Sequence, residues 1–338
     1  MVDNEAPRRT EPQAEGCVVV GCDGSWESLE AVDVAAREAR WRGQELVVVT
    51  LEEGMGRGAH GPRDWAGSAR EVAEEVRSAG ARALERLRTT DVPARTVTAT
   101  TAASPALEPL AQRASVLVLG RHGARGVGIF TMGSPSEALA RRLGCPVMVA
   151  GPTGPQAEPT GSAGAGGQHV KPNAAKAAAL ARRHPVVVVG VDSSPSADAV
   201  LGVAVAQAQT RGWPLTVVHS VGRAEAELHV EASVIWDRHA DLLLAQRDPD
   251  HSLARVVVDL DDPVPALLSH SGPRDLLVVG TRGEGRLAGL IAGSVARGVL
   301  DAMPCDVLVV PRHMTSATAQ QGRAATDTVV EPTTSGAR

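Results

Sequence analysis

The sequence predicts an α/β fold of two tandem domains, each a doubly wound, five-stranded parallel sheet of Rossmann-like type. Short apolar runs alternate with segments of helical spacing along most of the 338 residues, which is typical of a parallel sheet covered by helices on both faces. The same pattern then occurs a second time, after a stretch rich in Gly, Pro, Ala, Thr and Ser.

The composition fits this fold and excludes several classes of protein. Hydrophobic residues make up 43% of the chain and aromatic residues only 2%, so the cores must be built from Val, Leu and Ala. With a net charge of -5, few aromatics and no basic run, we expect no nucleic-acid partner. No apolar stretch approaches the roughly 20 residues that span a bilayer. Since the first 16 residues are polar and do not read as a secretory signal, we expect a cytoplasmic protein without a membrane partner.

The first half contains five expected strands and four expected helices. The turn Asp23-Gly24-Ser25 leads from the first strand into its helix, and Ser104-Pro105 suit the cap and first turn of another. The strands are expected at 17–21, 45–51, 94–100, 116–119 and 146–150, and the helices over about 25–42, 65–88, 104–113 and 133–143, with a surface loop at 52–64.

The second half repeats this order with one deletion. The apolar run that ends at Asp192 echoes the run that ends at Asp23, an offset of 169 residues. Later features, such as Cys145 and Cys305, are offset by 160. We therefore expect the second half to be nine residues shorter, between its second and third strands. The predicted organisation is a disordered tail (1–15), a first domain (16–151), a linker (152–184), a second domain (185–312) and a disordered tail (313–338).

A glycine loop occurs in both halves, directly after an apolar strand and before a helix. The second copy is Gly280-Thr281-Arg282-Gly283, nine residues, then Gly293-Ser294; the first runs from Gly120 to Ser134 with the same spacing. Glycines let the backbone approach an anion, and the free N–H groups of a helix start point at it. If the first and fourth strands of each half are neighbours, the Asp and the glycine loop meet at one crevice.

Lysine is almost absent from the chain. The two lysines, Lys171 and Lys176, both lie in the expected linker. A Walker-type loop places a Lys on the phosphates, so this class of ATPase is excluded.

On these residues the sequence resembles the universal stress protein family. The resemblance rests on the G-x2-G-x9-G-[ST] loop in both halves, on the Asp that ends each first strand, and on Val217-Val218-His219-Ser220; it covers about 17–151 and 185–312. It implies two domains of the adenine-nucleotide alpha-hydrolase-like fold, and in the nucleotide-binding branch it implies ATP in the crevice. A Mg²⁺ that arrives with ATP would keep most of its waters.

The resemblance implies a set of nucleotide-binding positions in each half. Asp192 would meet the ribose or the adenine side, and the backbone at His219 and Ser220 would meet adenine. The phosphates would lie along Gly280, Arg282, Gly283, Gly293, Ser294 and Val295. The corresponding first-half positions are Asp23, Thr50, Leu51, Gly120, His122, Gly123, Gly133 and Ser134, with Ser136 supplying a hydroxyl one position later.

The two copies differ at one backbone donor. Pro135 stands where the second half has Val295, and proline lacks an N–H. We therefore expect ATP in the second half more than in the first.

Simpler interpretations remain open for each of these residues. The loops can be strand-to-helix turns without a ligand, and Asp23 and Asp192 can serve helix capping alone. His219 can be structural. The acidic run 259–262 suggests a metal site, but a solvated loop at a strand end fits it better.

Two classes of function follow. The first is a binding and signalling module that holds nucleotide without efficient turnover, and the second is a slow ATP hydrolase or phosphotransferase. A third possibility is a stress protein that binds cyclic AMP or no nucleotide. Hydrolysis needs a group to orient water and a cationic clamp, and only His122 and Arg282 are candidates, so we expect no efficient enzyme.

The last strand of each half is apolar and short, and exposed strand edges invite pairing. The resemblance implies that 146–150 and 306–310 pair antiparallel within one chain, which would place Cys145 and Cys305 at opposite ends of the contact. Cys17 and Cys22 lie five apart on one strand and face opposite sides, so they cannot bridge. Whether two chains form a homodimer stays open.

Overall fold

The computed structural model describes about half of the chain. The described residues are 16–51, 69–99, 107, 109–121, 144–152, 180, 183–192, 194, 196–222, 254–281, 293–311 and 314. The expected loop at 52–64, the expected helix at 133–143 and the expected tail at 1–15 lie outside these residues, as does the expected tail at 313–338 apart from Met314, which is buried.

The first half follows the expected order of elements. Its central strands β1 and β4 are rich in Val or Leu and are almost fully buried, as a covered parallel sheet requires, whereas the edge strand β3 is partly exposed. They are β1 (Cys17–Cys22), β2 (Leu46–Leu51), β3 (Ala94–Ala99), β4 (Ala114–Leu119) and β5 (Val147–Val149), and the helices are α1 (Trp26–Arg42) and α2 (Ala69–Leu87). Residues 107 and 109–111 are also helical, within the range expected for a short helix.

The second half repeats the order. Its elements are β6 (Val187–Val191), α6 (Ala197–Arg211), β7 (Leu215–Ser220), β8 (Ala254–Asp259), α9 (Pro263–His270), β9 (Leu276–Gly280), α10 (Ser294–Ala302) and β10 (Asp306–Val310). The start of β7 keeps the offset of 169 from that of β2, whereas the start of β8 is offset by 160 from that of β3. The nine-residue deletion therefore lies between β7 and β8, as predicted.

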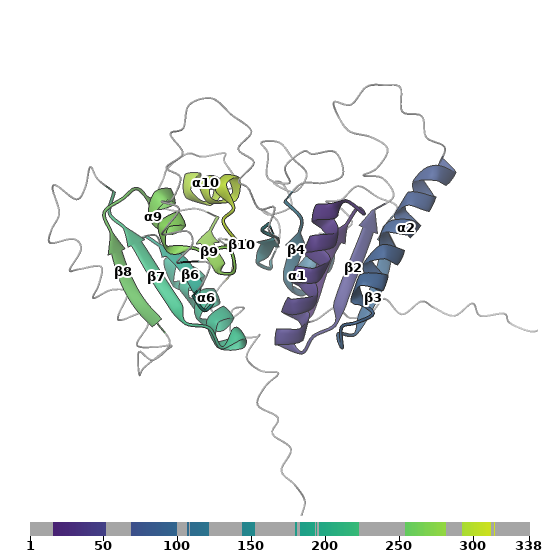
Figure 1. Ribbon diagram of the computed structural model, residues 1–338, viewed down its shortest axis with the longest axis horizontal. Helices are drawn as coiled ribbons and strands as arrows, with labels where there is room; N and C mark the ends of the chain where they lie inside the picture. The colour runs from purple at the N-terminus through teal and green to yellow at the C-terminus, as the bar shows by residue number, and fades with distance from the viewer. Residues whose placement is uncertain are drawn as a thin grey trace, which may run out of the picture.

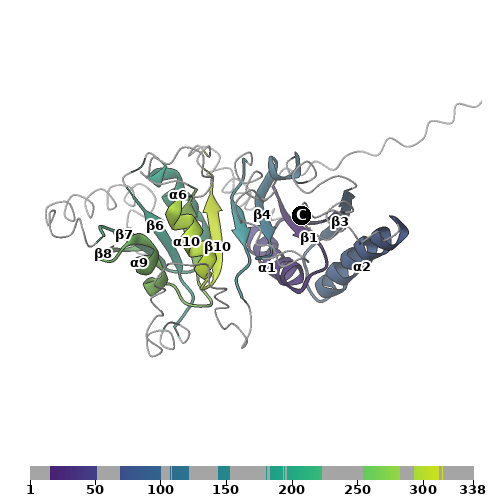
Figure 2. The same ribbon diagram turned by 90° about the horizontal axis from the view of Figure 1, so that it is seen from above.

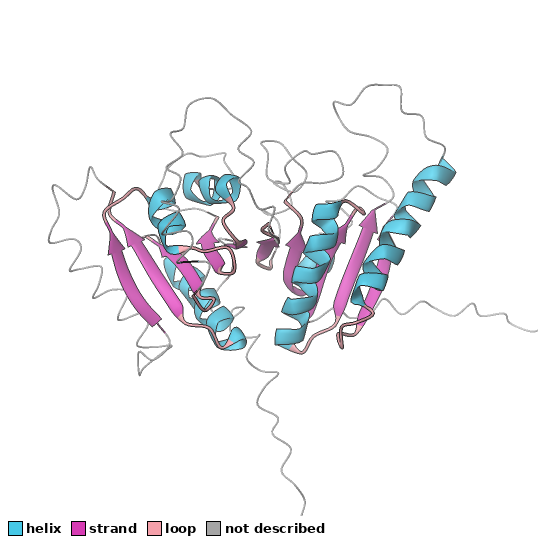
Figure 3. Cartoon of the chain, viewed as in Figure 1, coloured by secondary structure: helices cyan, strands magenta, loops and turns pink. Residues whose placement is uncertain are grey.

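The ten described strands form one sheet, in the order β3-β2-β1-β4-β5-β10-β9-β6-β7-β8. Figures 1 and 3 show the two halves side by side, with helices packed on the sheet. Pairing is parallel within each half, and β1 lies beside β4 as β6 lies beside β9. The halves join through β5 and β10, which pair antiparallel with Met148 opposite Leu308. This confirms the predicted pairing of the last strands.

The core on one face of the sheet is continuous across both halves. A single cluster of buried residues contains Val18 and Val20 of β1, Leu201 of α6 and Leu308 of β10. The opposite face is divided into a first-half cluster with Leu117 and a second-half cluster under α9 and α10. Figure 2 shows the sheet from above with the helices against it.

The cysteines lie where the strand geometry predicts. Cys22 belongs to the shared cluster and Cys17 to the cluster on the other face, so the two point away from each other. All four cysteines are free and buried. The β5–β10 register places Cys145 and Cys305 at opposite ends of the contact, as expected.

A second contact between the halves lies where α1 meets α6. Glu38 of α1 forms an ion pair with Arg211 of α6, and the two side chains are only 1% and 2% exposed. Arg211 also lies over the Trp41 ring, 4.6 Å from its centroid, and Trp41 meets Trp213 edge to face at 5.5 Å. Buried charges are stable only when paired, so this cluster ties the halves together.

The end of the expected linker packs against the second half. Arg183 donates to the Asp275 carboxylate at 2.5 Å and to the carbonyl of His270 at 2.8 Å. Arg274 in turn donates to the carbonyl of Arg183. The contacts of the second half therefore begin before residue 185. Among the described residues, none of the helices has the length and apolarity to cross a bilayer.

Candidate functional site

The candidate site lies at the carboxyl ends of the middle strands of each half, where the strand order reverses. In the second half β6 and β9 are neighbours, so Asp192 and Gly280 follow adjacent strands. In the first half β1 and β4 are neighbours, which brings Asp23 and Gly120 to the same edge. Ligands of open α/β sheets bind at such switch points.

In the second half, the two ends of the glycine loop are tied to each other. The Gly293 N–H donates to the carbonyl of Thr281, and Thr281 itself donates to the carbonyl of Val310 at 3.0 Å. The start of α10 therefore sits directly beside the end of β9. Gly293 is the N-cap residue and, having no side chain, makes no side-chain capping bond.

The first turn of α10 presents backbone donors that no side chain caps. The first intrahelical bond runs from Arg297 to the carbonyl of Gly293 at 3.0 Å. The N–H groups of Ser294, Val295 and Ala296 precede it, and Ser294 is exposed. Because Gly293 already donates to Thr281, the donors available to an anion are those three and not Gly293, which corrects the expectation for that residue.

Asp192 shapes the turn from β6 to α6. Its Oδ1 accepts the N–H of Ser194 at 3.1 Å, and the hydroxyls of Ser194 and Ser196 lie 2.8 Å apart. Ser196, the N-cap residue of α6, has a helical backbone and makes no side-chain capping bond. Asp192 is half-buried at the edge where β6 and β9 end.

The equivalent turn of the first half is bonded more fully. One carboxylate oxygen of Asp23 accepts both the N–H (2.9 Å) and the hydroxyl (2.6 Å) of Ser25. Ser25 caps α1 by accepting the N–H of Ser28 at 3.2 Å. Asp23 thus accepts an N–H bond, as the capping alternative expected, but the cap of the helix is Ser25.

The ends of the second strands hold polar side chains that are already bonded. His219 is 5% exposed, and its Nδ1 donates to the carbonyl of Val191 at 3.1 Å. Ser220 donates to the carbonyl of Asp261 at 2.5 Å. In the first half the Thr50 hydroxyl, in the place of His219, bonds to that of Thr98 at 3.1 Å. Leu51 ends β2, the position equivalent to Ser220.

Gly120 has a structural reason to be glycine. A Cβ at this position would lie 2.8 Å from the backbone carbonyl of Glu27 and 3.0 Å from the N–H of Ser28. The first turn of α1 therefore packs directly on the end of β4. This glycine alone gives no evidence of a ligand.

Sequence reasoning missed Arg82, which lies beside the first-half turn. Gly24 has φ +80°, and a Cβ there would overlap the guanidinium of Arg82. The helical spacing predicted the helix at 65–88 but gave no reason to single out this charged residue. Arg82 brings a positive charge to the edge where Asp23 lies.

Seven expected site residues lie outside the described part of the chain. They are Arg282 and Gly283 in the second half and His122, Gly123, Gly133, Ser134 and Ser136 in the first. Their roles stay predictions, as does the effect of Pro135.

The described side chains offer neither a metal cluster nor an activated thiol. Within the described ranges, no group of three or more His, Cys, Asp or Glu could hold a metal ion. Asp259 is less solvated than expected, since its carboxylate lies 2.9 Å from Nε2 of His270. Burial raises the pKa of each thiol, that of Cys145 to about 12, so none of them is a nucleophile near neutral pH.

Comparison with known proteins matches this arrangement to one family. The model of the universal stress protein family matches residues 17–151 and 185–311. The universal stress protein Rv2005c of Mycobacterium tuberculosis is 29% identical over 315 residues, which are 89% of this chain and 98% of that protein. A crystal structure of a universal stress protein from Archaeoglobus fulgidus is 16% identical, covers 89% of this chain and 97% of its own, and has a TM-score of 0.58, so it shares the fold. A universal stress protein solved in complex with cAMP is 26% identical and covers 38% of this chain and 98% of its own, with a TM-score of 0.30.

Proposed function

The chain belongs to the universal stress protein family, and we propose that it holds ATP, or a closely related adenine nucleotide, at the carboxyl ends of β6 and β9. The bound nucleotide then acts as a signal in a stress response. The observation that carries this proposal is the bond from Gly293 to Thr281, which fixes the uncapped start of α10 at the strand ends. A helix start of this kind attracts phosphate through its N–H groups and its dipole.

The second half is proposed as the stronger of the two sites. Asp192 lies on the strand beside the glycine loop, within the same edge as the start of α10. In the first half, Pro135 lacks the N–H that Val295 offers. Arg82 supplies a positive charge near Asp23 that partly offsets this loss.

We propose a binding module and not an efficient enzyme. The ring of His219 is only 5% exposed and donates through Nδ1 to the carbonyl of Val191, and we assign it no role as a base. Both lysines lie in the expected linker, and phosphoryl transfer needs a cationic clamp on the transferred group. A protein of this kind binds ATP with turnover far slower than one per second, an order-of-magnitude limit set against typical kcat values.

The first experiment identifies the nucleotide. The purified full chain is heated to release bound ligand, the extract is separated by chromatography, and the emptied protein is titrated with ATP, ADP and cAMP by calorimetry. We expect ATP or ADP to bind more tightly than cAMP, because the start of α10 offers donors to more than one phosphate group. A protein that is purified empty and gives no heat with any of the three rules out the nucleotide site.

The second experiment locates it. Gly293→Val places a branched side chain where a phosphate would approach the first turn of α10, and we expect ATP affinity to fall about tenfold, the order of what a partly buried helix N-terminus gives an anion. The matched change in the first half, Gly133→Val, should leave the tighter site unchanged. Thermal melting without nucleotide checks that both variants fold. Unchanged affinity in Gly293→Val would count against the site in the second half.

A further inference from the structure

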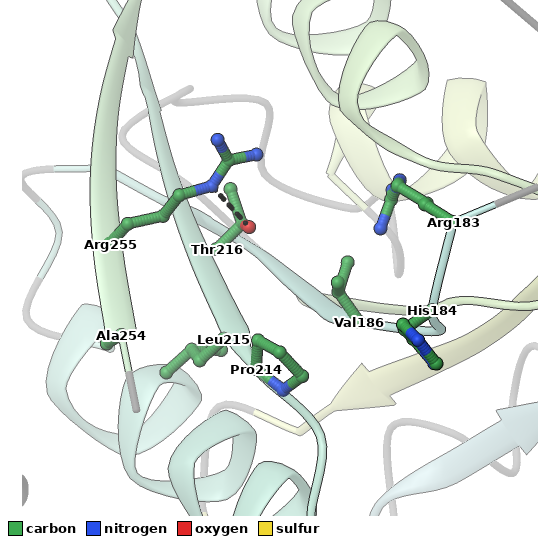
Figure 4. Close-up of a pocket in the computed structure, with 8 residues that line it drawn as sticks. All are labelled: Arg183, His184, Val186, Pro214, Leu215, Thr216, Ala254 and Arg255. Carbon is green, nitrogen blue, oxygen red and sulfur yellow. Dashed lines mark hydrogen bonds between the residues drawn. The ribbon is translucent and has the colours of Figure 1, made fainter. Parts of the chain in front are cut away.

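A cavity of about 460 Å³ lies at the opposite end of the second half, under the amino ends of β6, β7 and β8. Figure 4 shows its walls, which are largely apolar and include Val186, Pro214, Leu215 and Ala254. These residues lie at the beginnings of the strands, whereas the candidate nucleotide site lies at their carboxyl ends. The two are therefore separated by the length of the strands. The volume is in the range of small-molecule sites.

Two guanidinium groups flank this cavity, and among the described residues only that of Arg183 has an ion-pair partner. Figure 4 shows Arg255 and Arg183 on opposite sides of the space. Arg183 is bonded to the carboxylate of Asp275 at 2.5 Å. Arg255 uses its Nε to donate to the Thr216 hydroxyl at 3.1 Å and, within the described part of the chain, makes no ion pair. Its two terminal amino groups are therefore available to an acceptor.

The first half contains the same arginine with an acid beside it. The register Val47↔Arg95 in the first half corresponds to Thr216↔Arg255 in the second, so the two arginines are equivalent. The Arg95 Nε lies 3.1 Å from a carboxylate oxygen of Glu45. The Nε–H is not aimed at that oxygen, and Nε and Nη2 are buried without a hydrogen-bond partner, so the contact is one of charge and not a hydrogen bond.

In the second half this acid is missing. Glu45 precedes β2 as Pro214 precedes β7, and the carbonyl of each accepts a backbone N–H from the neighbouring strand at 2.9 Å, from Val18 and Val187 respectively. Replacement of the acid by proline removes the internal counter-charge of Arg255. The same replacement adds apolar surface to the cavity wall.

From these contacts we propose that the cavity binds a small organic anion with an apolar body, such as a medium-chain carboxylate, and that Arg255 contacts its anionic group. A guanidinium offers two parallel N–H groups that match the two oxygens of a carboxylate. The apolar walls take the hydrocarbon part, which gains from leaving water. The ligand thus replaces the carboxylate that Glu45 supplies in the first half.

The test uses octanoate as the probe and octan-1-ol as its uncharged match. Calorimetry on the full chain should show saturable binding of one octanoate, and octan-1-ol should bind about tenfold more weakly because it lacks the charged acceptor. Absence of saturable octanoate binding, or equal affinity for the alcohol, overturns the proposal.

Two substitutions locate the probe. Arg255→Gln should weaken octanoate binding about tenfold, the order expected for a partly exposed charged contact, while the matched variant Arg95→Gln should leave it unchanged. Pro214→Glu should weaken binding as well, because it restores the acid found in the first half. If Arg255→Gln binds octanoate as tightly as the unaltered chain, the assignment is wrong, whatever the folding of Pro214→Glu.

Discussion

The first helix of each half ends in the same way but begins differently. α1 and α6 both stop at a glycine in the left-handed conformation, Gly43 with φ 61° and Gly212 with φ 64°. At their starts, Ser25 caps α1 through a hydrogen bond, whereas Ser196 makes no side-chain capping bond. The ends lie toward the amino edge of the sheet, and the starts lie toward the candidate site. The repeat has thus preserved what shapes the core and varied what a ligand would meet.

The residues at which α1 and α6 meet also differ between the two copies of the repeat. Glu38 on α1 and Gln207 on α6 are equivalent positions, as are Arg42 and Arg211. The Glu38 carboxylate pairs with both Arg211 and Arg42, the latter at 3.3 Å, while the Gln207 side chain accepts from Arg211. Two glutamates here would bury two like charges, which is unfavourable. With the neutral amide of Gln207 in the place of a second glutamate, the first half supplies the buried acid and the second half supplies the arginine that pairs with it.

Arg211→Ala should therefore have the largest effect on stability. Of the two arginines that pair with Glu38 in the described structure, the variant leaves Arg42 alone, and it removes the contact of Arg211 with the Trp41 ring. Loss of one partner from a buried ion pair lowers the free energy of unfolding by about 3–5 kcal/mol. Urea unfolding followed by circular dichroism measures this loss.

An exposed pair provides the control for that variant. Arg88 and Glu85 lie 3.1 Å apart on the surface, with side chains 72% and 68% exposed. Arg88→Ala should lower the free energy of unfolding by well under 1 kcal/mol, since water screens such pairs, an order-of-magnitude limit. Similar losses in the two variants would mean that the contact between α1 and α6 contributes no more than a surface pair.

Substitution of the glycine that ends each first helix should destabilise the two halves equally, and by less than the loss of the contact between α1 and α6. At each end the residue after the glycine donates to a carbonyl at 2.9 Å, Gln44 to Ala39 and Trp213 to Ala208. A Cβ on Gly43 or Gly212 meets no atom within 4 Å, so only backbone strain opposes alanine. Each substitution should lower the free energy of unfolding by about 1 kcal/mol.

Substitution of a glycine that has an ordinary helical backbone should change the free energy of unfolding in the opposite direction. Gly80 lies inside α2, and a Cβ there would meet Thr50 at 3.6 Å, an ordinary contact. Gly80→Ala should raise the free energy of unfolding by about 0.5–1 kcal/mol, because alanine loses less entropy in a helix. Urea unfolding under the same conditions compares all three variants, and unequal losses for Gly43→Ala and Gly212→Ala would break the equivalence of the two ends.

Backbone features were predictable from the sequence because each depends on local pattern. The Val runs of the strands, the turn at Asp23 and the repeat at constant offset led to the elements, their order and the place of the deletion. Adjacency of β1 to β4 was a condition of the predicted crevice, set by the rule for switch points, and the joining of the halves through β5 and β10 came from the family resemblance. The register then follows from which face of each strand is apolar.

Side-chain partners were not predictable, because they depend on distant residues. Nothing near Arg82 in the sequence shows that it lies against Gly24, 58 positions earlier. The donor of Gly293 was assigned to phosphate, but it is taken by Thr281 across the loop. The free guanidinium of Arg255 becomes visible only when its strand is paired with β7 and compared with the first half.

The reaction rates of Cys145 and Cys305 test whether the two halves open together or separately. Of all the comparisons between the halves, we expect the smallest difference here. Both are buried and free, in equivalent positions before the last strand of each half. Burial raises the pKa of Cys145 to about 12 and that of Cys305 well above its usual value, so neither thiol reacts until its surroundings open.

Cys145 packs in the first-half cluster and Cys305 in the second-half cluster, while the opposite face holds one core that both halves share. If the shared core governs opening, the two thiols should react with N-ethylmaleimide at rates within a factor of about three, since residues of one cooperative unit open together. Labelling of the native chain at pH 8, followed by mass spectrometry of its peptides, gives each rate. A ratio of about thirty or more would show that each half opens on its own, because such a ratio corresponds to about 2 kcal/mol between the opening free energies. The continuous core would then join the halves in space without making them one unit of unfolding.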